Sequence, residues 1–232
     1  MRALLSGHWA CFTDICVKSM PTPTARIFST FGWHGFPDAM FYEDHFGLRF
    51  DLGGDLPMGP LRFLQAIDRA RTITRAAFQN SSQVTAVVSH YGGERRSRRD
   101  FASFKQLREI GFDFPFGPPE KVPQRDQKHI AEYGEDLCRY WYAINFPNDQ
   151  EPVSALLWAS VVKEMPIAPK ARWLDIHIVD FDRGLVLRAY DDRGMDIVAT
   201  RSGPLEPLYL TFDAWLLDHD RAAMDTKFRR PC

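Results

Sequence analysis

Cysteine is scarce in this sequence. It occurs four times in 232 residues, as Cys11, Cys16, Cys138 and Cys232, and only the first two lie close together. A disulfide framework needs a denser set, so this distribution excludes a disulfide-rich secreted domain and predicts a reducing compartment. Cys11 and Cys16 with His8 also fall short of a zinc site, because a second pair of ligands is missing. We therefore predict no metal and no cofactor.

An excess of charge of one sign is also missing. The chain has 29 basic and 30 acidic residues, so its net charge is −1, which gives no global attraction to nucleic acid or to a membrane surface. No apolar run approaches the roughly 20 residues that a membrane span needs, and His8 and Asp14 interrupt the amino-terminal apolar stretch. We predict a soluble, cytoplasmic protein with neither a nucleic-acid nor a membrane partner.

The motifs of common enzyme classes are absent. The sequence has no His-Glu-x-x-His, no serine between flanking glycines and no glycine-rich phosphate loop. A run of arginines (Arg95, Arg96, Arg98 and Arg99) could contact phosphates, but it lacks interleaved aromatic residues and Glu94 flanks it. We interpret the run as a solvated loop, with contact to an acidic patch on a partner as the alternative.

Length and composition are those of a globular protein with a sizeable core. Hydrophobic residues make up 45% of the chain, including 18 Phe and 6 Trp. We predict a single domain over residues 1–232, with residues 1–25 as an amino-terminal extension. Residues 20–37, rich in Pro, Gly and aromatic residues, predict an irregular packed segment. The proline-rich stretch 112–126 predicts a loop and offers an alternative boundary between two halves.

Apolar residues at helical spacing predict a helix over 60–79, opened by Pro60. Its buried stripe, three and four residues apart, comprises Phe63, Ala66, Ala70, Ile73 and Ala77, widened by Leu64 and Ile67. Further helices are predicted over 101–110, 205–217 and 221–228. Residues 151–163 favour a helix through length and alanine content, although their valines leave a strand as the alternative.

Two Asp-Arg-Gly triplets, at 182–184 and 192–194, separate three runs of alternating apolar residues. Such a pattern predicts a three-stranded antiparallel meander, with Gly184 and Gly194 supplying positive φ at the turns. The aspartates can accept hydrogen bonds from turn amides, so the repeat indicates two similar turns rather than a duplicated active site. Strands are predicted near 47–51, 83–91, 139–146, 173–181, 185–190 and 195–199. The fold class is therefore α+β, a mainly antiparallel sheet with helices packed on one face.

The carboxyl-terminal third resembles a known family. "AYDDRGMDIVA", "LEPLY" and "WLLDHDRAAMDTKF" are similar to a bacterial domain of unknown function with a Tyr-Asp-Asp-Arg-Gly-Met-Asp turn and a Trp-Leu-Leu-Asp-[Tyr/His]-Asp-Arg helix. His219 stands where that family usually has Tyr. "GLRFDLG" and "FLQAIDRARTITRAAF" extend the resemblance over about residues 25–230. It implies no reaction, cofactor or catalytic residue, but the association of such domains with toxin loci implies an immunity role.

Charged and aromatic side chains on the last strands and helices form the candidate surface. We predict that they face solvent and bind a partner: Asp175, His177, Arg188, Tyr190, Asp191, Asp192, Asp196, Asp218 and Asp220. The first functional hypothesis is a protein-binding module, an immunity protein that occludes the active site of a cognate toxin. Its acidic side chains would pair with basic groups in the toxin cleft, around a Tyr or Trp anchor.

Two alternatives stay open. The chain would be a hydrolase if His177, His219 and at least two aspartates converged in one pocket. It would be a structural domain if the aspartates only formed turns, helix caps and ion pairs with Arg193 and Arg221, with Asp220 as a cap. The absence of a nucleophile motif favours the non-catalytic hypotheses, and no residue is assigned a catalytic role.

Overall fold

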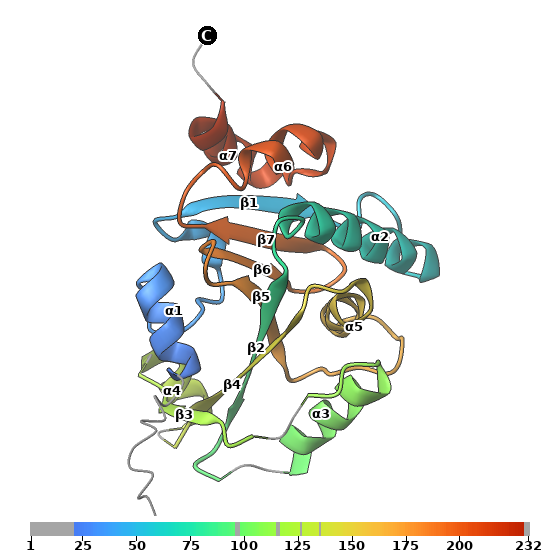
Figure 1. The fold of residues 1–232 in the computed structure, drawn as a ribbon. Helices are drawn as coiled ribbons and strands as arrows, with labels where there is room; N and C mark the ends of the chain where they lie inside the picture. Colours follow the sequence, from blue (N-terminus) through green and yellow to red (C-terminus); the bar gives the residue numbers. More distant parts are fainter. Residues whose placement is uncertain (1–20, 96–97, 115–116, 126, 135, 230–232) are drawn as a thin grey trace, which may run out of the picture.

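An antiparallel β-sheet organises the molecule (Figure 1). The computed structural model describes residues 21–95, 98–114, 117–125, 127–134 and 136–229. Seven strands pair in the order β1-β7-β6-β5-β2-β4-β3, and all neighbours are antiparallel. The strands are β1 (Phe46–Asp51), β2 (Gln83–Gly92), β3 (Glu120–Pro123), β4 (Cys138–Pro147), β5 (Asp175–Asp180), β6 (Leu185–Ala189) and β7 (Gly194–Ala199). The sheet and its helices confirm the α+β class.

Helices lie before the first strand, between later strands and after the last of them. The α-helices are α1 (Pro23–Phe31), α2 (Pro60–Ala77), α3 (Arg98–Glu109), α4 (Gln127–Tyr133), α5 (Gln150–Val161), α6 (Glu206–Thr211) and α7 (Arg221–Phe228). Short 3₁₀ turns are η1 (Met40–Tyr42), η2 (Asp213–Trp215) and η3 (Asp218–Asp220). The helix favoured over 151–163 is confirmed by α5.

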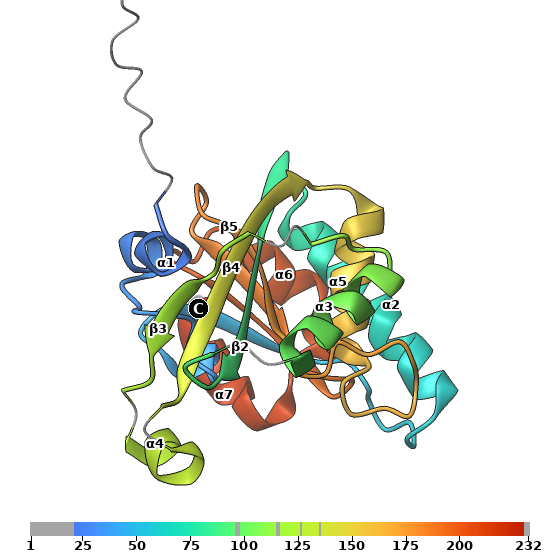
Figure 2. The ribbon, with the colours of Figure 1, turned by 90° about the horizontal axis from the view of Figure 1, so that it is seen from below.

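One side of the sheet, called here the α2 face, carries the larger core. Figures 1 and 2 show α2, α3 and α5 on this side. The five residues of the predicted α2 stripe are all buried there, because a 3.6-residue repeat keeps them on one side of the helix. Leu64 was expected to widen the stripe but is exposed.

The opposite side, called here the α1 face, has its own smaller core. Ile27 and Phe31 of α1 pack with Val87 and Trp141 from the sheet, and Figure 2 shows α1 across the sheet from α2. The prediction of an irregular segment over 20–37 is therefore wrong for its central part. Thr22 caps α1, proline occupies the first turn, and Gly32 ends the helix at φ 74°. The sheet thus has covered surfaces on both sides.

Two other segments differ from expectation. The predicted helix 205–217 is split, because Leu216 adopts extended backbone, bridges to Phe50 of β1 and is followed by Leu217, whose N–H donates to the Arg49 carbonyl at 2.8 Å. α6 and α7 consequently lie beside β1 at the sheet edge (Figure 1). The loop predicted over 112–126 contains β3, which joins the sheet through β4. Residues 1–20, with His8, Cys11 and Cys16, lie outside the described residues.

The two Asp-Arg-Gly turns use their glycines differently. Gly184 has φ 60° as predicted, and the carboxylate of Asp180 accepts from the Arg183 amide at 2.9 Å. Gly194 is instead the first residue of β7 and is not in the positive-φ region. It must be small because a Cβ there would overlap the Tyr190 hydroxyl and approach the Phe50 carbonyl oxygen to 2.9 Å.

Candidate functional site

Most of the predicted acidic surface is buried, which corrects the expectation that it faces solvent. Four of its aspartates are only 1–7% exposed: Asp191, Asp192, Asp196 and Asp220. Each has an arginine partner: Asp191 has Arg193, Asp192 has Arg62 at 2.5 Å, and Asp196 and Asp220 share Arg49 at 3.0 and 2.9 Å. Buried carboxylates with such partners hold segments together and leave no negative charge to present outward.

The Arg49 side chain of β1 contacts three other elements, β7, η1 and η3. Its Nε donates to Asp196 of β7, and its Nη1 donates to Asp220 and, at 2.7 Å, to the Tyr42 hydroxyl. Asp220 stands at the N-cap of α7 but makes no side-chain cap bond, so its predicted capping role is wrong. Tyr190 is half-buried nearby, and its burial beside Asp196 raises its pKa to about 12. These contacts are structural.

Asp175, at the start of β5, lies among three cations. Its Oδ1 is 3.1 Å from Arg188 Nη2 and 3.5 Å from Lys163 Nζ, and its Oδ2 is 3.4 Å from Arg139 Nη2. Burial alone would raise the pKa of Asp175, but Lys163, Arg188 and Arg139 outweigh burial and hold the pKa well below its ordinary 3.8. In this group, called here the Asp175 cluster, the carboxylate is surrounded by cations and presents no unpaired negative charge.

His177 is fully buried on the α1 face, although it was expected on an exposed polar face. Its ring stacks on Phe36 with centroids 4.4 Å apart. Neither ring nitrogen has a hydrogen-bond partner in the described part of the chain. Burial lowers the pKa of His177 well below its ordinary 6.5, so the imidazole is neutral at physiological pH. Phe36 lies in the segment after α1 and covers the His177 ring. For this reason the alternating pattern of β5 did not place His177 at the surface.

The two histidines of the hydrolase hypothesis do not converge. His177 lies on β5, and three strand steps lead through β6 and β7 to β1, a separation of about 14 Å. His219 lies beyond β1, close to the groove described next. Among the described residues, no group of three His, Cys, Asp or Glu side chains is suited to hold a metal ion.

Asp218 and His219 line an open groove of about 570 Å³. The loop between β1 and α2 forms one wall, with Asp51 and Asp55, and Arg69 projects from α2. Arg69 lies 3.7 Å from Asp51, and the lining contains three aspartates, Asp51, Asp55 and Asp218, and one arginine. We call this feature the acidic groove. Of the predicted acidic residues, Asp218 is exposed here.

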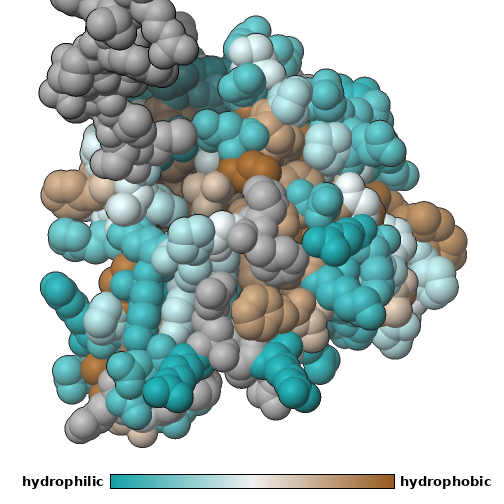
Figure 3. All heavy atoms as spheres, turned by 60° about the horizontal axis from the view of Figure 1, so that its bottom comes forward, coloured by the Kyte–Doolittle hydropathy of each residue, from teal (hydrophilic) through white to brown (hydrophobic). Residues whose placement is uncertain are grey.

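Exposed apolar side chains lie just before α2 and in its first turns, on the helix whose Gln65 and Arg69 line the acidic groove. Met58, Leu61 and Leu64 are 62%, 72% and 56% exposed, and Leu61 and Leu64 lie one helical turn apart. Figure 3 shows apolar side chains at its right margin, where Figure 1 has the amino-terminal end of α2. We call these three residues the apolar rim.

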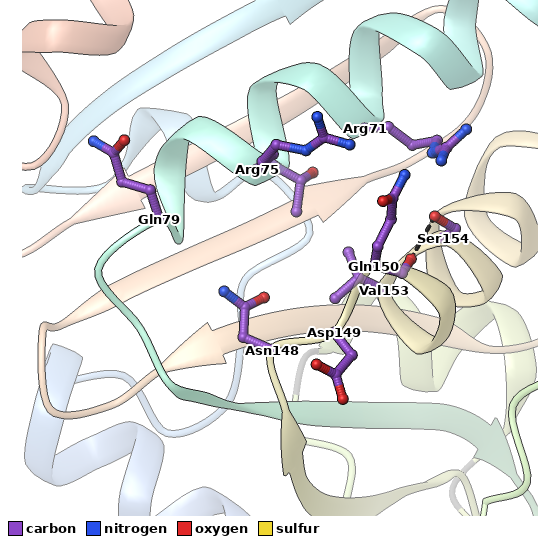
Figure 4. Close-up of a pocket in the computed structure, with 9 residues that line it drawn as sticks. Arg71, Arg75, Gln79, Asn148, Asp149, Gln150, Val153 and Ser154 are labelled. Carbon is purple, nitrogen blue, oxygen red and sulfur yellow. Dashed lines mark hydrogen bonds between the residues drawn. The ribbon is translucent and has the colours of Figure 1, made fainter.

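A second cavity, of about 160 Å³, lies between α2 and α5. Arg71 and Arg75 of α2 point toward Gln150 of α5 (Figure 4). Figure 4 draws the Gln150 amide with its nitrogen toward the arginines, but exchanging nitrogen and oxygen satisfies both groups, and the oxygen then accepts from Arg75 Nη2 at 3.1 Å and from Arg71 Nη2. This arginine pocket was missed by sequence reasoning. The available signal was two like charges at i and i+4 on one helix, an arrangement that is unfavourable without an anion.

The remaining sequence candidates that the structure describes belong to none of these features. Arg95 is exposed and Arg98 begins α3, whereas Arg96 lies outside the described residues. Cys138 is a buried free thiol. No helix of the described chain is long and apolar enough to cross a membrane.

Comparison with known proteins gives one result. The family model of a domain of unknown function, DUF3885, matches residues 25–220. No curated protein and no solved structure matches the chain.

Proposed function

The chain belongs to the family of the domain of unknown function DUF3885, and we propose that it is a protein-binding module that docks a basic partner in the acidic groove. The observation that carries this proposal is the juxtaposition of exposed carboxylates with an exposed apolar rim. Protein interfaces commonly combine an apolar centre with a polar edge of complementary charge.

Charge is the first part of the argument. Within the described residues, Asp55 and Asp218 have no ion-pair partner, unlike the buried aspartates of the neighbouring strands. Their field therefore reaches solvent and attracts a cationic surface over about one Debye length, roughly 8 Å at physiological ionic strength. Lys or Arg side chains of a partner could pair with Asp55 and Asp218 without first breaking an existing ion pair.

The apolar rim is the second part. Leu61 and Leu64 point away from the core, since the buried stripe of α2 occupies the other side of the helix. Covering one such leucine contributes about 1.5–3 kcal/mol. A docked partner would thus gain hydrophobic burial at the rim and charge pairing in the groove.

The immunity hypothesis is the specific form of this proposal. A toxin with a basic active cleft has the chemistry that the acidic groove would occlude, and Asp218 keeps the role assigned to it on sequence grounds. The surface differs from the one first expected, because Asp191, Asp192, Asp196 and Asp220 are already paired inside the protein. Among the described residues, no contact favours the hydrolase alternative.

Binding to the protein encoded by the adjacent gene tests the proposal. We expect Asp55→Asn with Asp218→Asn to weaken the Kd roughly tenfold or more, with a smaller salt dependence. We expect Leu61→Ser with Leu64→Ser to weaken it further. The matched control is Asp113→Asn with Glu132→Gln, which removes two exposed charges away from the groove. Binding that all variants leave unchanged would refute docking at the acidic groove.

A further inference from the structure

The arginine pocket holds more hydrogen-bond donors than its own residues can satisfy. Arg71 and Arg75 project from α2 into a cavity of about 160 Å³ (Figure 4). In the described part of the chain their polar contacts are with one neutral acceptor, the Gln150 amide oxygen. Arg71 Nε is shielded from solvent and has no acceptor there. Two guanidinium groups thus share a single uncharged oxygen.

Among the described residues no ion pair joins Arg71 or Arg75 to a carboxylate, although Glu151 lines the neighbouring hollow together with Arg71. Asp149 contributes to the lining, but Figure 4 shows its carboxylate turned away from both guanidinium heads. Like charges one helical turn apart destabilise a helix. Arginine forks match oxyanions in planar, bidentate geometry, so an oxyanion between the two heads would reverse that repulsion.

The size of the cavity restricts the ligand. Pockets for drug-sized molecules measure about 300–1,000 Å³, and a cavity of about 160 Å³ holds a group equivalent to several water molecules. A tetrahedral oxyanion fits that description. A neighbouring hollow of about 500 Å³, which shares Arg71 and Gln150 and extends to Trp158, leaves room for the rest of an organic phosphate.

We propose that the arginine pocket binds a phosphate-type oxyanion between Arg71 and Arg75. The anion displaces or shares the Gln150 oxygen and accepts from both guanidinium groups. The Ser154 hydroxyl lies at the same wall but donates to the Gln150 backbone carbonyl at 2.6 Å, so the two arginines are the donors that hold the anion. The site is separate from the acidic groove, because Arg69 and Arg71 point to different sides of α2. It does not depend on the proposed docking function.

Titration of the purified chain with inorganic phosphate, at constant ionic strength set with chloride, tests the site. We expect saturable binding by calorimetry with a Kd on the order of 1 mM, and a rise in Tm with phosphate concentration. Arg75→Gln, at an exposed position that tolerates substitution, should weaken binding roughly tenfold or more. Arg201→Gln, which removes an exposed arginine elsewhere, should leave it unchanged.

Gln150→Glu separates binding from folding. A carboxylate at this position pairs internally with Arg71 and Arg75 and adds negative charge to the first turn of α5. We expect this variant to match or exceed the wild-type Tm without phosphate and to lose the phosphate response. A wild-type chain that shows no saturable response, or a Gln150→Glu chain that titrates like wild type, would overturn the proposal.

Discussion

Asp175 is the carboxylate on which Arg139, Lys163 and Arg188 converge. Asp175→Asn would leave Lys163 and Arg188 without their carboxylate partner and Arg139 with Asp38 alone, at 3.9 Å. We expect the free energy of unfolding to fall by about 3 kcal/mol, the usual effect of removing one partner from a buried ion pair. Urea denaturation at pH 7 measures this change.

An exposed pair serves as the control for Asp175→Asn. Asp113 pairs with Arg108 at 2.8 Å on the surface, where ion pairs contribute about 0–1 kcal/mol. Asp113→Asn should therefore change stability little. Equal effects of the two substitutions would show that the Asp175 cluster does not stabilise the fold.

His177 makes a pH-dependent contribution to stability. The folded imidazole stays neutral because burial lowers its pKa well below 6.5, whereas in the unfolded chain it takes up a proton below about pH 6.5. The unfolded state then binds more protons, so the stability that is present above pH 6.5 is lost as the pH falls. The slope from this residue is at most about 1.4 kcal/mol per pH unit.

His177→Leu should remove that slope. It should also preserve or raise stability at pH 7, because both ring nitrogens are buried without a partner among the described residues and an apolar side chain avoids that penalty. Chemical denaturation at pH 7 and pH 5 compares the variant with wild type. His219→Leu, on the exposed groove, is the control. A wild-type pH slope retained in His177→Leu would contradict a buried neutral imidazole.

At the scale of elements, the close approach of β7 to its neighbours depends on Gly194. Gly194→Ala would push a methyl group into the Tyr190 hydroxyl and toward the Phe50 carbonyl. We expect destabilisation of about 1–3 kcal/mol, seen as a lower urea midpoint. Gly203→Ala, where a Cβ would meet nothing within 4 Å, should be nearly neutral. An equally stable Gly194→Ala chain would mean that this part of the sheet relaxes freely.

Elements with one strong period could be predicted from the sequence. The stripe from Phe63 to Ala77 identified α2, and alternation with glycine turns identified β5, β6 and β7. α1 was missed because a segment dense in aromatic residues has no clear period, although Thr22 and Pro23 carried a start signal. The split after α6 was missed because Leu216 pairs with β1, a contact between residues far apart in sequence.

The site was harder to predict than the fold because its charges are paired across long sequence separations. Alternation made His177 and Asp196 look exposed, but α1 and its following segment cover that face. Arg49 of β1 pairs with Asp196 of the adjacent strand β7, and Arg139 of β4 reaches Asp175 of β5 across β2. Only the folded chain reveals this order of strands. Arg71 and Arg75 lie four residues apart on one helix, so their proximity could be predicted from the sequence without knowing the order of the strands.

At the scale of the whole molecule, the sheet interleaves the two halves of the sequence. β2, from the first half, lies between β4 and β5, and β1 pairs with β7. A boundary within 112–126 would therefore cut one sheet whose strands share both cores. We predict a single cooperative unfolding transition over the whole sheet.

Two probes test this prediction in one urea titration. Far-ultraviolet circular dichroism follows the helices, the three longest of which (α2, α3 and α5) lie on the α2 face. Tryptophan fluorescence compared between wild type and Trp141→Phe isolates a buried residue of the α1 face. Coincident midpoints and slopes are expected, because loss of either core exposes apolar residues on the strands that carry the other. An early change confined to Trp141 would show instead that the α1 face unfolds as a separate unit.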